Sequence, residues 1–213
     1  LNALRSKAER ADDGTYKISG QKIFITYGEH DMSTNIVHLV LARLPDAPPG
    51  TRGISLFLVP KFIPDEDGNP GTLNDVRCSG LEHKMGIHGS PTCTMIYGDK
   101  GGATGWLIGE ENRGLACMFT MMNNARLAVG LQGVAAAERA TQQALAFAQE
   151  RKQGRPPAWQ GQTGEMAPIA AHADVQRMLM TMTAMTAAAR AICYLTAAAT
   201  DLSHRATDEM ARQ

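Results

Sequence analysis

The sequence predicts an α+β chain in which an antiparallel β-barrel or sandwich is followed by long helices. Short apolar runs rich in β-branched residues, bounded by glycine and proline, recur between residues 12 and 108. After Gly109, alanine, methionine, leucine and glutamine replace the β-branched residues, and residues 115–149 contain no proline. The first pattern is typical of strands and the second of helices, so the change near residue 110 marks a boundary between two structural parts.

The expected strands follow one another closely in the first part. A turn at residues 13–14 has the sequence Asp-Gly, which commonly joins strands. In residues 20–26, isoleucines at alternate positions separate Lys22, Phe24 and Thr26, and this period of two predicts a strand whose isoleucines form one packed face. The other expected strands cover residues 15–19, 36–42, 54–59, 76–80, 92–97 and 105–108.

The second part is expected to form two long helices. The first covers most of residues 115–149, where Gly130 and Gly133 would each cost about 1 kcal/mol relative to alanine and so indicate close approach of another backbone or a ligand. Residues 154–168 form a loop, and a second helix follows from residue 169. Its apolar residues recur at three- and four-residue spacing, which predicts a stripe that packs against the first helix and against helices outside this chain. The stripe consists of Val175, Met178, Met182, Met185, Ala189, Ile192, Leu195, Ala199 and Leu202.

Composition argues against several classes of protein. The 213 residues include 21 Lys+Arg and 21 Asp+Glu, so no charge of one sign steers the molecule toward nucleic acid or an anionic membrane. The four cysteines have no paired spacing, which favours a reducing, cytoplasmic location over a disulfide or zinc framework. A soluble protein is expected, because no signal-peptide pattern or apolar run of membrane-spanning length is recognised. The chain starts at Leu1 without methionine and stops within a helix-like stretch, so we expect a piece of a longer polypeptide.

Three clusters of residues could carry chemistry. Phe24 and Thr26, at a strand end, could place a ring and a hydroxyl against a flat heterocycle, and an ordinary half-buried strand would have the same pattern. Arg126 lies among apolar and small neighbours. Arg151 and Lys152 close the first helix, where they could simply complement the helix dipole. The six histidines lack metal-site spacing, and nucleophile-elbow and phosphate-loop patterns are absent, so metal-dependent and hydrolytic functions are not supported.

Several motifs, taken in order, resemble the acyl-CoA dehydrogenase family. They are Gly-Gln-Lys-Ile-Phe-Ile-Thr at 20–26, Glu-His-Lys-Met-Gly-Ile-His-Gly-Ser-Pro-Thr at 82–92, Leu-Ile-Gly-Glu at 107–110, Met-Met-Asn-Asn-Ala-Arg-Leu at 121–127 and Gly-Leu-Gln-Gly at 130–133. The motif at 82–92 is most similar to the subgroup that includes 3-methylthiopropanoyl-CoA dehydrogenases. The resemblance implies that residues 1–110 form the middle β-barrel domain and that residues 111–213 form the first helices of an incomplete four-helix bundle.

The resemblance also implies an FAD-dependent enzyme that introduces an α,β double bond into an acyl-CoA thioester and passes a hydride to flavin N5. The family's usual base, a glutamate near the C-terminus, would lie past Gln213. Ala125 occupies the position at which a minority of members carry that base, and the family's upstream flavin-binding motif would precede Leu1. We therefore expect no catalytic base in this chain, and we expect the fragment itself to be inactive and largely without FAD.

In the family, the strand end matched by Phe24, Ile25 and Thr26 packs on the flavin, and the hydroxyl at the position of Thr26 is directed toward N5. Phe24 stands where tryptophan is common, so it keeps the ring and loses the indole donor. A segment near the acyl-CoA is matched by four residues of the first long helix. They are Asn123, Asn124, Ala125 and Arg126.

A second part of the family's FAD site is an Arg-Lys-Thr-Phe-Gly turn after the first bundle helix, which reaches the pyrophosphate of a neighbouring subunit's FAD. This chain has Arg151, Lys152 and Gln153 there, with glutamine in place of threonine and no phenylalanine. His172 and Ala173 align with another pair that contacts FAD. These five residues are therefore candidate FAD ligands.

The resemblance implies acyl-CoA as substrate, an electron-transferring flavoprotein as electron acceptor, and a homodimer or homotetramer. Two alternatives stay open. A DNA-associated alkylation-response flavoprotein of the same family should carry a basic patch and lose DNA affinity steeply with salt, and the zero net charge argues against it. A non-catalytic scaffold or oligomerisation module predicts that replacing Thr26 with valine changes nothing.

Overall fold

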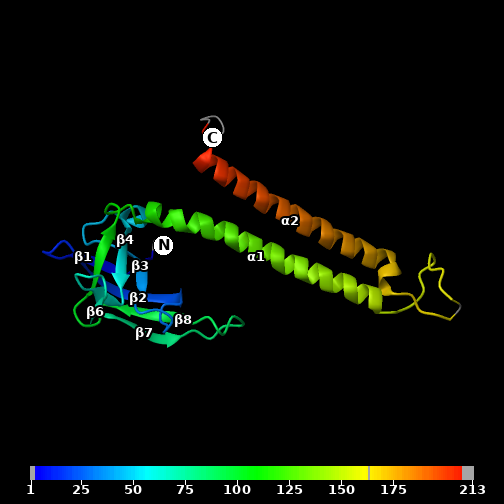
Figure 1. Cartoon of the computed structure of the whole chain (residues 1–213), viewed down its shortest axis with the longest axis horizontal. Coiled ribbons are helices and arrows are strands. Elements are labelled where there is room, and N and C mark those ends of the chain that lie inside the picture. Colours follow the sequence, from blue (N-terminus) through cyan, green and yellow to red (C-terminus); the bar gives the residue numbers. More distant parts are fainter. Residues whose placement is uncertain (1–2, 163, 208–213) are drawn as a thin grey trace. The chain divides into compact units, whose positions relative to one another are not determined.

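The computed structural model describes residues 3–162 and 164–207. The chain divides into two compact units, Leu1–Met121 and Met122–Gln213, and the division falls within the first long helix. The first unit is built mainly of strands and the second of helices (Figure 1). The predicted order, strands followed by long helices, is confirmed.

The strands of the first unit form an antiparallel sheet in the order β3-β4-β9-β2-β8-β7, with β1 paired to the first half of β2. β5 and β6 form a separate two-stranded sheet, and a 3-10 helix, Gly50–Gly53, precedes β4. The short strands β1, β5 and β6 were not predicted, because their sequences are charged or rich in proline and glycine. The strands are β1 (Lys7–Arg10), β2 (Tyr16–Thr26), β3 (Val37–Ala42), β4 (Ser55–Pro60), β5 (Phe62–Pro64), β6 (Pro70–Leu73), β7 (Val76–Leu81), β8 (Thr92–Tyr97) and β9 (Ala103–Ile108).

Within the described residues, the strand ladders do not close into a continuous barrel. β3 and β7 are the two ends of the pairing order, and an isolated parallel bridge between Lys7 and Arg43 links β1 to the residue after β3. The Ala8 amide donates to the Arg43 carbonyl over 2.8 Å, and the Arg43 amide donates to the Ser6 carbonyl over 3.0 Å. The expected barrel is therefore an open antiparallel sheet. A gap remains between β1 and β3, and among the described residues only a single bridge spans it, because β1 is four residues long.

β2, with 11 residues, changes partners along its length. Its first half pairs with β1 and β9, and from Gly20 onward it pairs with β8. Gly20 has a φ of +133°, and a Cβ atom at this position would lie 2.9 Å from Ser6 Oγ. Glycine is needed here, because other residues rarely adopt this φ and because the neighbouring chain leaves no room for a side chain.

The core of the first unit gathers apolar side chains from β2, β3, β4, β8 and β9. In β3 the side chains alternate, so that His38, Val40 and Ala42 are buried while Val37 and Leu39 are 54% and 45% exposed. This period of two confirms the strand predicted for residues 36–42. Large side chains that are almost fully buried in this core include Ile18, Phe57, Val59 and Met95.

The helices are α1 (Gly114–Glu150), which begins in the first unit, and α2 (Ala173–Arg205), and a short 3-10 helix, Ile169–Ala171, precedes α2. In the second unit α2 returns alongside α1 (Figure 1). The hydroxyls of Thr141 on α1 and Thr186 on α2 lie 3.5 Å apart, and both side chains are buried. Two antiparallel helices in contact fit the start of the expected bundle.

The two glycines in the interior of α1, Gly130 and Gly133, differ in what surrounds them. A Cβ atom at Gly130 would lie 3.6 Å from Cys193 Sγ of α2, which is an ordinary van der Waals contact. A Cβ atom at Gly133 would have no described atom within 4 Å. A side chain of α2 therefore lies beside Gly130 at ordinary contact distance, and among the described residues the expected close approach of another backbone is found at neither glycine.

The apolar stripe of α2 is divided between two environments. Val175, Met182 and Ala189 are half-buried, as a stripe packed on α1 should be. The other large members of the stripe are between 45% and 70% exposed, because they lie beside the contact face and not on it. These exposed members are Met178, Met185, Ile192, Leu195 and Leu202.

Among the described residues, α2 is long and apolar enough, by length and composition alone, to span a membrane. The expectation that no apolar run approaches this length was therefore wrong. Threonines and Arg190 interrupt the apolar residues of α2, and its average hydropathy is still high because its many alanines and methionines are apolar. The criteria are weak evidence, since the core helix of a soluble bundle meets them as well.

Candidate functional site

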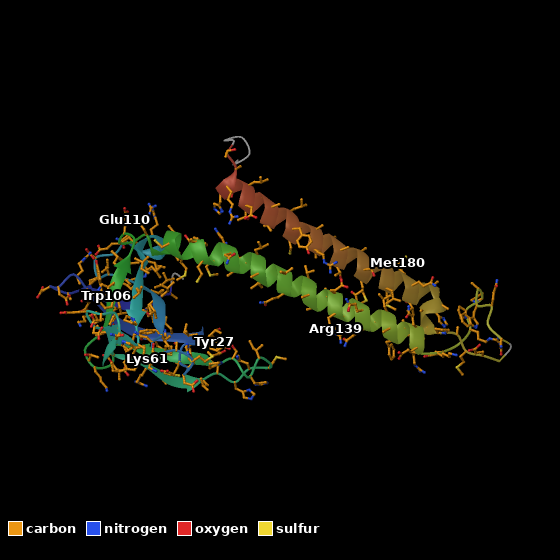
Figure 2. All side chains as sticks on the ribbon, in the orientation of Figure 1. Tyr27, Lys61, Trp106, Glu110, Arg139 and Met180 are labelled. Carbon is orange, nitrogen blue, oxygen red and sulfur yellow. The ribbon has the colours of Figure 1, made fainter. Side chains whose placement is uncertain are left out.

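The candidate site lies at the end of β2. The pairing of β2 with β8 shifts between Lys22 and Ile25, which is a β-bulge, and Phe24 within it has a φ of +59°. Tyr27, directly after the strand, has a φ of +54° and lies at the end of β2 in Figure 2. Positive φ is uncommon for residues other than glycine, and such strained residues cluster at functional sites.

The bulge decides which side chains of the predicted strand end are packed. Phe24 is 64% exposed, Thr26 is exposed and Ile25 is half-buried. The expected packed face is therefore confirmed for Ile25 and wrong for Ile23, which is 54% exposed because the bulge interrupts the alternation. The ring of Phe24 and the hydroxyl of Thr26 are both at an open surface, as a ligand-binding strand end requires.

The end of β2 also meets the 82–92 motif, which forms the loop between β7 and β8. Thr26 pairs with Thr92, and the Tyr27 amide donates to the Pro91 carbonyl over 2.8 Å. The loop is held in shape by Lys84, whose ammonium donates to the carbonyls of Ile87 and Ser90 at 2.9 and 2.7 Å. Two motifs that lie far apart in the sequence are thus neighbours in the first unit.

A groove of about 640 Å³ lies between the end of β2 and the strand β3. Ile25 and Thr26 line it, together with residues 36–41 and with Met118 and Met121 from the start of α1. Phe24 is not among its lining residues. Mostly apolar walls with a few polar groups are typical of sites for small molecules and cofactors.

The polar groups of the groove include Thr26, Lys22, His38 and the hydroxyl of Tyr97. The Lys22 ammonium donates to the Leu41 carbonyl over 2.8 Å, and burial lowers the pKa of Lys22 to about 8. Burial also lowers the pKa of His38, whose Nδ1 lies 2.9 Å from the Tyr97 hydroxyl, and raises the pKa of Tyr97. The groove therefore offers a neutral histidine, a hydroxyl and an amine that loses its proton more readily than usual.

A second group of candidate residues comes together in the second unit, between the end of α1 and the start of α2. The Arg151 guanidinium donates to the Lys152 carbonyl over 3.2 Å and approaches the Gln153 side-chain oxygen at 3.5 Å. The His172 ring nitrogen Nε2 lies 2.7 Å from the Gln153 carbonyl, and Ala173 begins α2 directly after it. The structure thus brings together all five residues that were expected to contact FAD in this region.

Comparison with known proteins identifies the family. The model of the acyl-CoA dehydrogenase middle domain matches residues 1–99, and the model of the acyl-CoA dehydrogenase C-terminal domain matches residues 112–212. The chain belongs to the acyl-CoA dehydrogenase family. The resemblance carried by the sequence motifs is thereby confirmed.

Individual acyl-CoA dehydrogenases give the same result. A 3-methylmercaptopropionyl-CoA dehydrogenase from Ruegeria pomeroyi is 53% identical over 209 residues, which cover 98% of this chain and 35% of the relative. A butyryl-CoA dehydrogenase from Syntrophomonas wolfei is 44% identical over 219 residues, which cover 100% of this chain and 36% of the relative. The structure of butyryl-CoA dehydrogenase from Megasphaera elsdenii superposes with a TM-score of 0.65 at 27% identity, covering 91% of this chain and 44% of that one.

The chain spans about a third of the length of these two curated acyl-CoA dehydrogenases. Methylmercaptopropionyl and methylthiopropanoyl are two names for the same acyl group, so the first relative belongs to the subgroup that the 82–92 motif predicted.

The four residues matched to the acyl-CoA dehydrogenase substrate segment lie on α1 within the second unit. Arg126 and Asn123 are one turn apart, and the guanidinium donates to the Asn123 side-chain oxygen over 3.2 Å. Asn124 is exposed and Ala125 is half-buried. The segment is therefore a continuous helical surface with an arginine and two amides.

Lys22, His38 and Tyr97 line the groove and were not predicted as site residues. Lys22 lies within the first motif, and His38 is the polar member of the buried set in an alternating apolar strand. A polar residue at a core position of a strand is the signal that could have indicated His38, because such a group needs a hydrogen-bond partner. No sequence signal indicated that Tyr97 would face it.

Proposed function

We propose that this chain is part of an FAD-dependent acyl-CoA dehydrogenase, an oxidoreductase that introduces an α,β double bond into an acyl-CoA thioester. Family membership supports the reaction class. The single observation that supports a flavin site in this chain is the position of Thr26, whose side chain is exposed at a strand end and lines a largely apolar groove.

The residues of the groove fit a flat ring system. Ile25 and the aliphatic residues of β3 offer apolar walls, and the Thr26 hydroxyl can donate to or accept from a ring nitrogen. A bound flavin supplies a two-electron acceptor for the hydride that leaves the substrate β-carbon. Thr26 would hold the ring in position by a hydrogen bond, and the apolar walls would exclude water from it.

The cluster of Arg151, Lys152, Gln153 and His172 is proposed as a second contact region for FAD. Arg151 brings a guanidinium, whose planar set of donors suits the oxygens of a pyrophosphate. Within the described part of the chain, its guanidinium contacts the Lys152 carbonyl and the Gln153 amide oxygen, and neither of these partners carries a negative charge. Lys152 pairs with Glu165 at 2.6 Å, which makes Arg151 the better candidate of the two cations.

The proposed substrates are short-chain acyl-CoA thioesters, since the two curated relatives carry the names of a methylthiopropanoyl and a butyryl substrate. Comparison of kcat/KM for butyryl-CoA and 3-methylthiopropanoyl-CoA would separate these two. Asn123, Asn124, Ala125 and Arg126 are proposed to contact the substrate. An electron-transferring flavoprotein is the proposed electron acceptor, and a homodimer or homotetramer the proposed assembly.

Replacing Thr26 with valine in the enzyme that carries this chain tests the proposal. Valine keeps the branched shape and removes the hydroxyl, so flavin reduction by butyryl-CoA, followed as loss of the flavin absorbance in the absence of oxygen, should slow about fivefold. Thr196→Val is the matched control, because the Thr196 hydroxyl donates to the Ile192 carbonyl of its own helix at 2.8 Å. Equal rates in the two variants, or a protein that binds no flavin, would contradict the proposed function.

A further inference from the structure

A buried histidine and tyrosine under the groove are not used by the proposed function. His38 on β3 is 7% exposed and Tyr97 on β8 is 3% exposed, and both line the groove. Their rings meet edge to face with centroids 5.7 Å apart, and the Tyr97 hydroxyl lies 2.9 Å from His38 Nδ1. The other ring nitrogen, His38 Nε2, is buried and has no hydrogen-bond partner among the described residues.

The pairing determines which nitrogen of His38 carries the hydrogen. Burial keeps the ring neutral, and it outweighs the opposing effect of the nearby Glu29 carboxylate. The Tyr97 hydroxyl has one hydrogen, and His38 Nδ1 is its hydrogen-bond partner among the described residues. If this hydroxyl donates to Nδ1, the single hydrogen of the neutral imidazole is on Nε2. Nε2–H is then a buried donor without an acceptor, which is a costly state that a bound partner would relieve.

Lys22 adds donors to the same groove. Its ammonium has three N–H groups, and the hydrogen bond to the Leu41 carbonyl uses one of them. Lys22 and His38 both line the groove, and Thr26 adds a hydroxyl. Such a set suits a ligand that presents acceptors, and carbonyl oxygens are the strongest neutral acceptors of flat heterocycles and thioesters.

We propose that His38 Nε2 is a hydrogen-bond donor to a carbonyl oxygen of the molecule that occupies the groove, with Lys22 as a second donor beside it. The inference rests on the proposed function, because that function supplies two carbonyl-bearing molecules, the flavin ring and the acyl thioester. Since Nε2 is covered, a side chain must move to expose it. Met118 and Met121 line the groove, and unbranched methionine side chains adapt readily to a ligand.

Binding measurements on two variants test this subsite. The whole enzyme is freed of FAD, and the affinities of FAD and of butyryl-CoA are measured separately for wild type, His38→Phe and Tyr97→Phe. Loss of the donor should weaken the binding of one of these two ligands about fivefold. The ligand whose affinity falls is the one whose carbonyl oxygen is bound. Tyr97→Phe differs from wild type by one oxygen atom, so it tests the pair even where His38→Phe does not fold. Without the Tyr97 hydroxyl, the hydrogen of the neutral His38 ring can move to Nδ1, so Nε2 is no longer fixed as a donor.

Tyr16→Phe is the matched control, because it removes a tyrosine hydroxyl that donates to Glu111 at 2.9 Å and does not line the groove. This control should bind both ligands like the wild type. NMR of ¹⁵N-histidine-labelled enzyme gives a readout that packing alone would not change. The His38 signal, assigned by its loss in His38→Phe, should show a neutral ring with its hydrogen on Nε2, and that hydrogen should shift when the ligand is added.

The inference is overturned if His38→Phe and Tyr97→Phe bind both FAD and butyryl-CoA as tightly as Tyr16→Phe, or if the His38 hydrogen is found on Nδ1. This outcome is distinct from failure of the proposed function. If the proposed function fails, the wild-type enzyme binds no FAD, or butyryl-CoA reduces the flavin of Thr26→Val as fast as that of its control.

Discussion

The Lys22 ammonium donates a hydrogen bond to the backbone carbonyl of Leu41 over 2.8 Å. The amide and carbonyl of Arg43, two residues further along, bond instead to Ser6, which precedes β1, and to Ala8 within β1. Because alternate residues of a strand direct their backbone groups to the same edge, Leu41 and Arg43 belong to one edge of β3, opposite the edge that pairs with β4. β1 does not extend as far as Leu41, so the Lys22 side chain supplies a hydrogen-bond donor to Leu41 instead. The groove lies at this gap in the sheet.

The first prediction concerns pH and Lys22. Its folded pKa of about 8 lies below the ordinary value of 10.5, so the unfolded chain binds more protons between these two pH values. The Lys22 contribution should therefore be unfavourable below pH 8 and should become more favourable as the pH rises toward 10.5. We expect the free energy of unfolding of wild type, measured with urea, to rise relative to that of Lys22→Met over this range.

The subtraction is needed because other buried groups titrate in the opposite sense. Burial raises the pKa of Tyr97 and of Cys93, so both lose stabilising influence as the pH rises through their unfolded values. These contributions are common to wild type and Lys22→Met and cancel in the difference. A difference that stays constant from neutral pH to about pH 10 would show that Lys22 is not desolvated in the folded chain.

The second prediction concerns Gly20, at which β2 changes partners. An alanine there has to adopt a φ of +133° and place its Cβ 2.9 Å from Ser6 Oγ, so we expect Gly20→Ala to cost about 3 kcal/mol in urea unfolding. Gly14→Ala is the control, since Gly14 has a φ of +81° and open space around it, and we expect a cost of about 1 kcal/mol. Equal costs would mean that the contact with Ser6 has no energetic effect.

The strands of the first unit were largely predictable, because alternation of apolar residues and turn-forming glycines are local signals. The bulge at Phe24 was not, since it depends on how β2 meets β8, and one inserted residue moved Ile23 from the expected packed face to the surface. Thr26 was predicted as a site residue through its motif, and it lines the groove. The sheet gap that forms the groove was not, because β1 is a charged segment that gives no strand signal.

The helices show the same division between local and tertiary information. The helical period of the α2 stripe was correct, but five of its seven large residues are exposed, because periodicity fixes a face only within about one residue position. The candidate residues Arg151 and His172 come together through the chain reversal between α1 and α2. Spacing in the sequence could not show this, and the family resemblance indicated only that each residue is a candidate FAD contact.

The third prediction concerns Arg151. If its guanidinium binds a pyrophosphate oxygen, Arg151→Gln should weaken FAD binding to the whole enzyme about tenfold, as expected for a charge-assisted hydrogen bond. The loss should shrink at high salt, because a partly exposed ion pair is screened. Arg177→Gln is the matched control, since Arg177 pairs with Asp174 one turn away on α2 at 2.8 Å. Equal FAD dissociation constants for the two variants would remove Arg151 from the proposed site.

The last prediction concerns the contact between the helices of the second unit. Val134, Thr141 and Ala148 are buried at a spacing of seven residues on α1, which is the repeat of a helix seam packed on a second helix. Ala148 is only 2% exposed, so a larger side chain there must displace its neighbours. We expect Ala148→Leu to lower the free energy of unfolding of this chain by about 2 kcal/mol, followed by the helical circular dichroism signal in urea.

Ala146→Leu provides the comparison, because Ala146 is exposed two residues away on the same helix. Alanine and leucine are both strong helix formers, so the substitution itself should change stability by less than about 0.5 kcal/mol. The difference between the two variants therefore measures packing and not helix propensity. If Ala148→Leu is as stable as Ala146→Leu, the seam is loose enough to accept three more carbon atoms, and the seven-residue spacing does not define a packed interface.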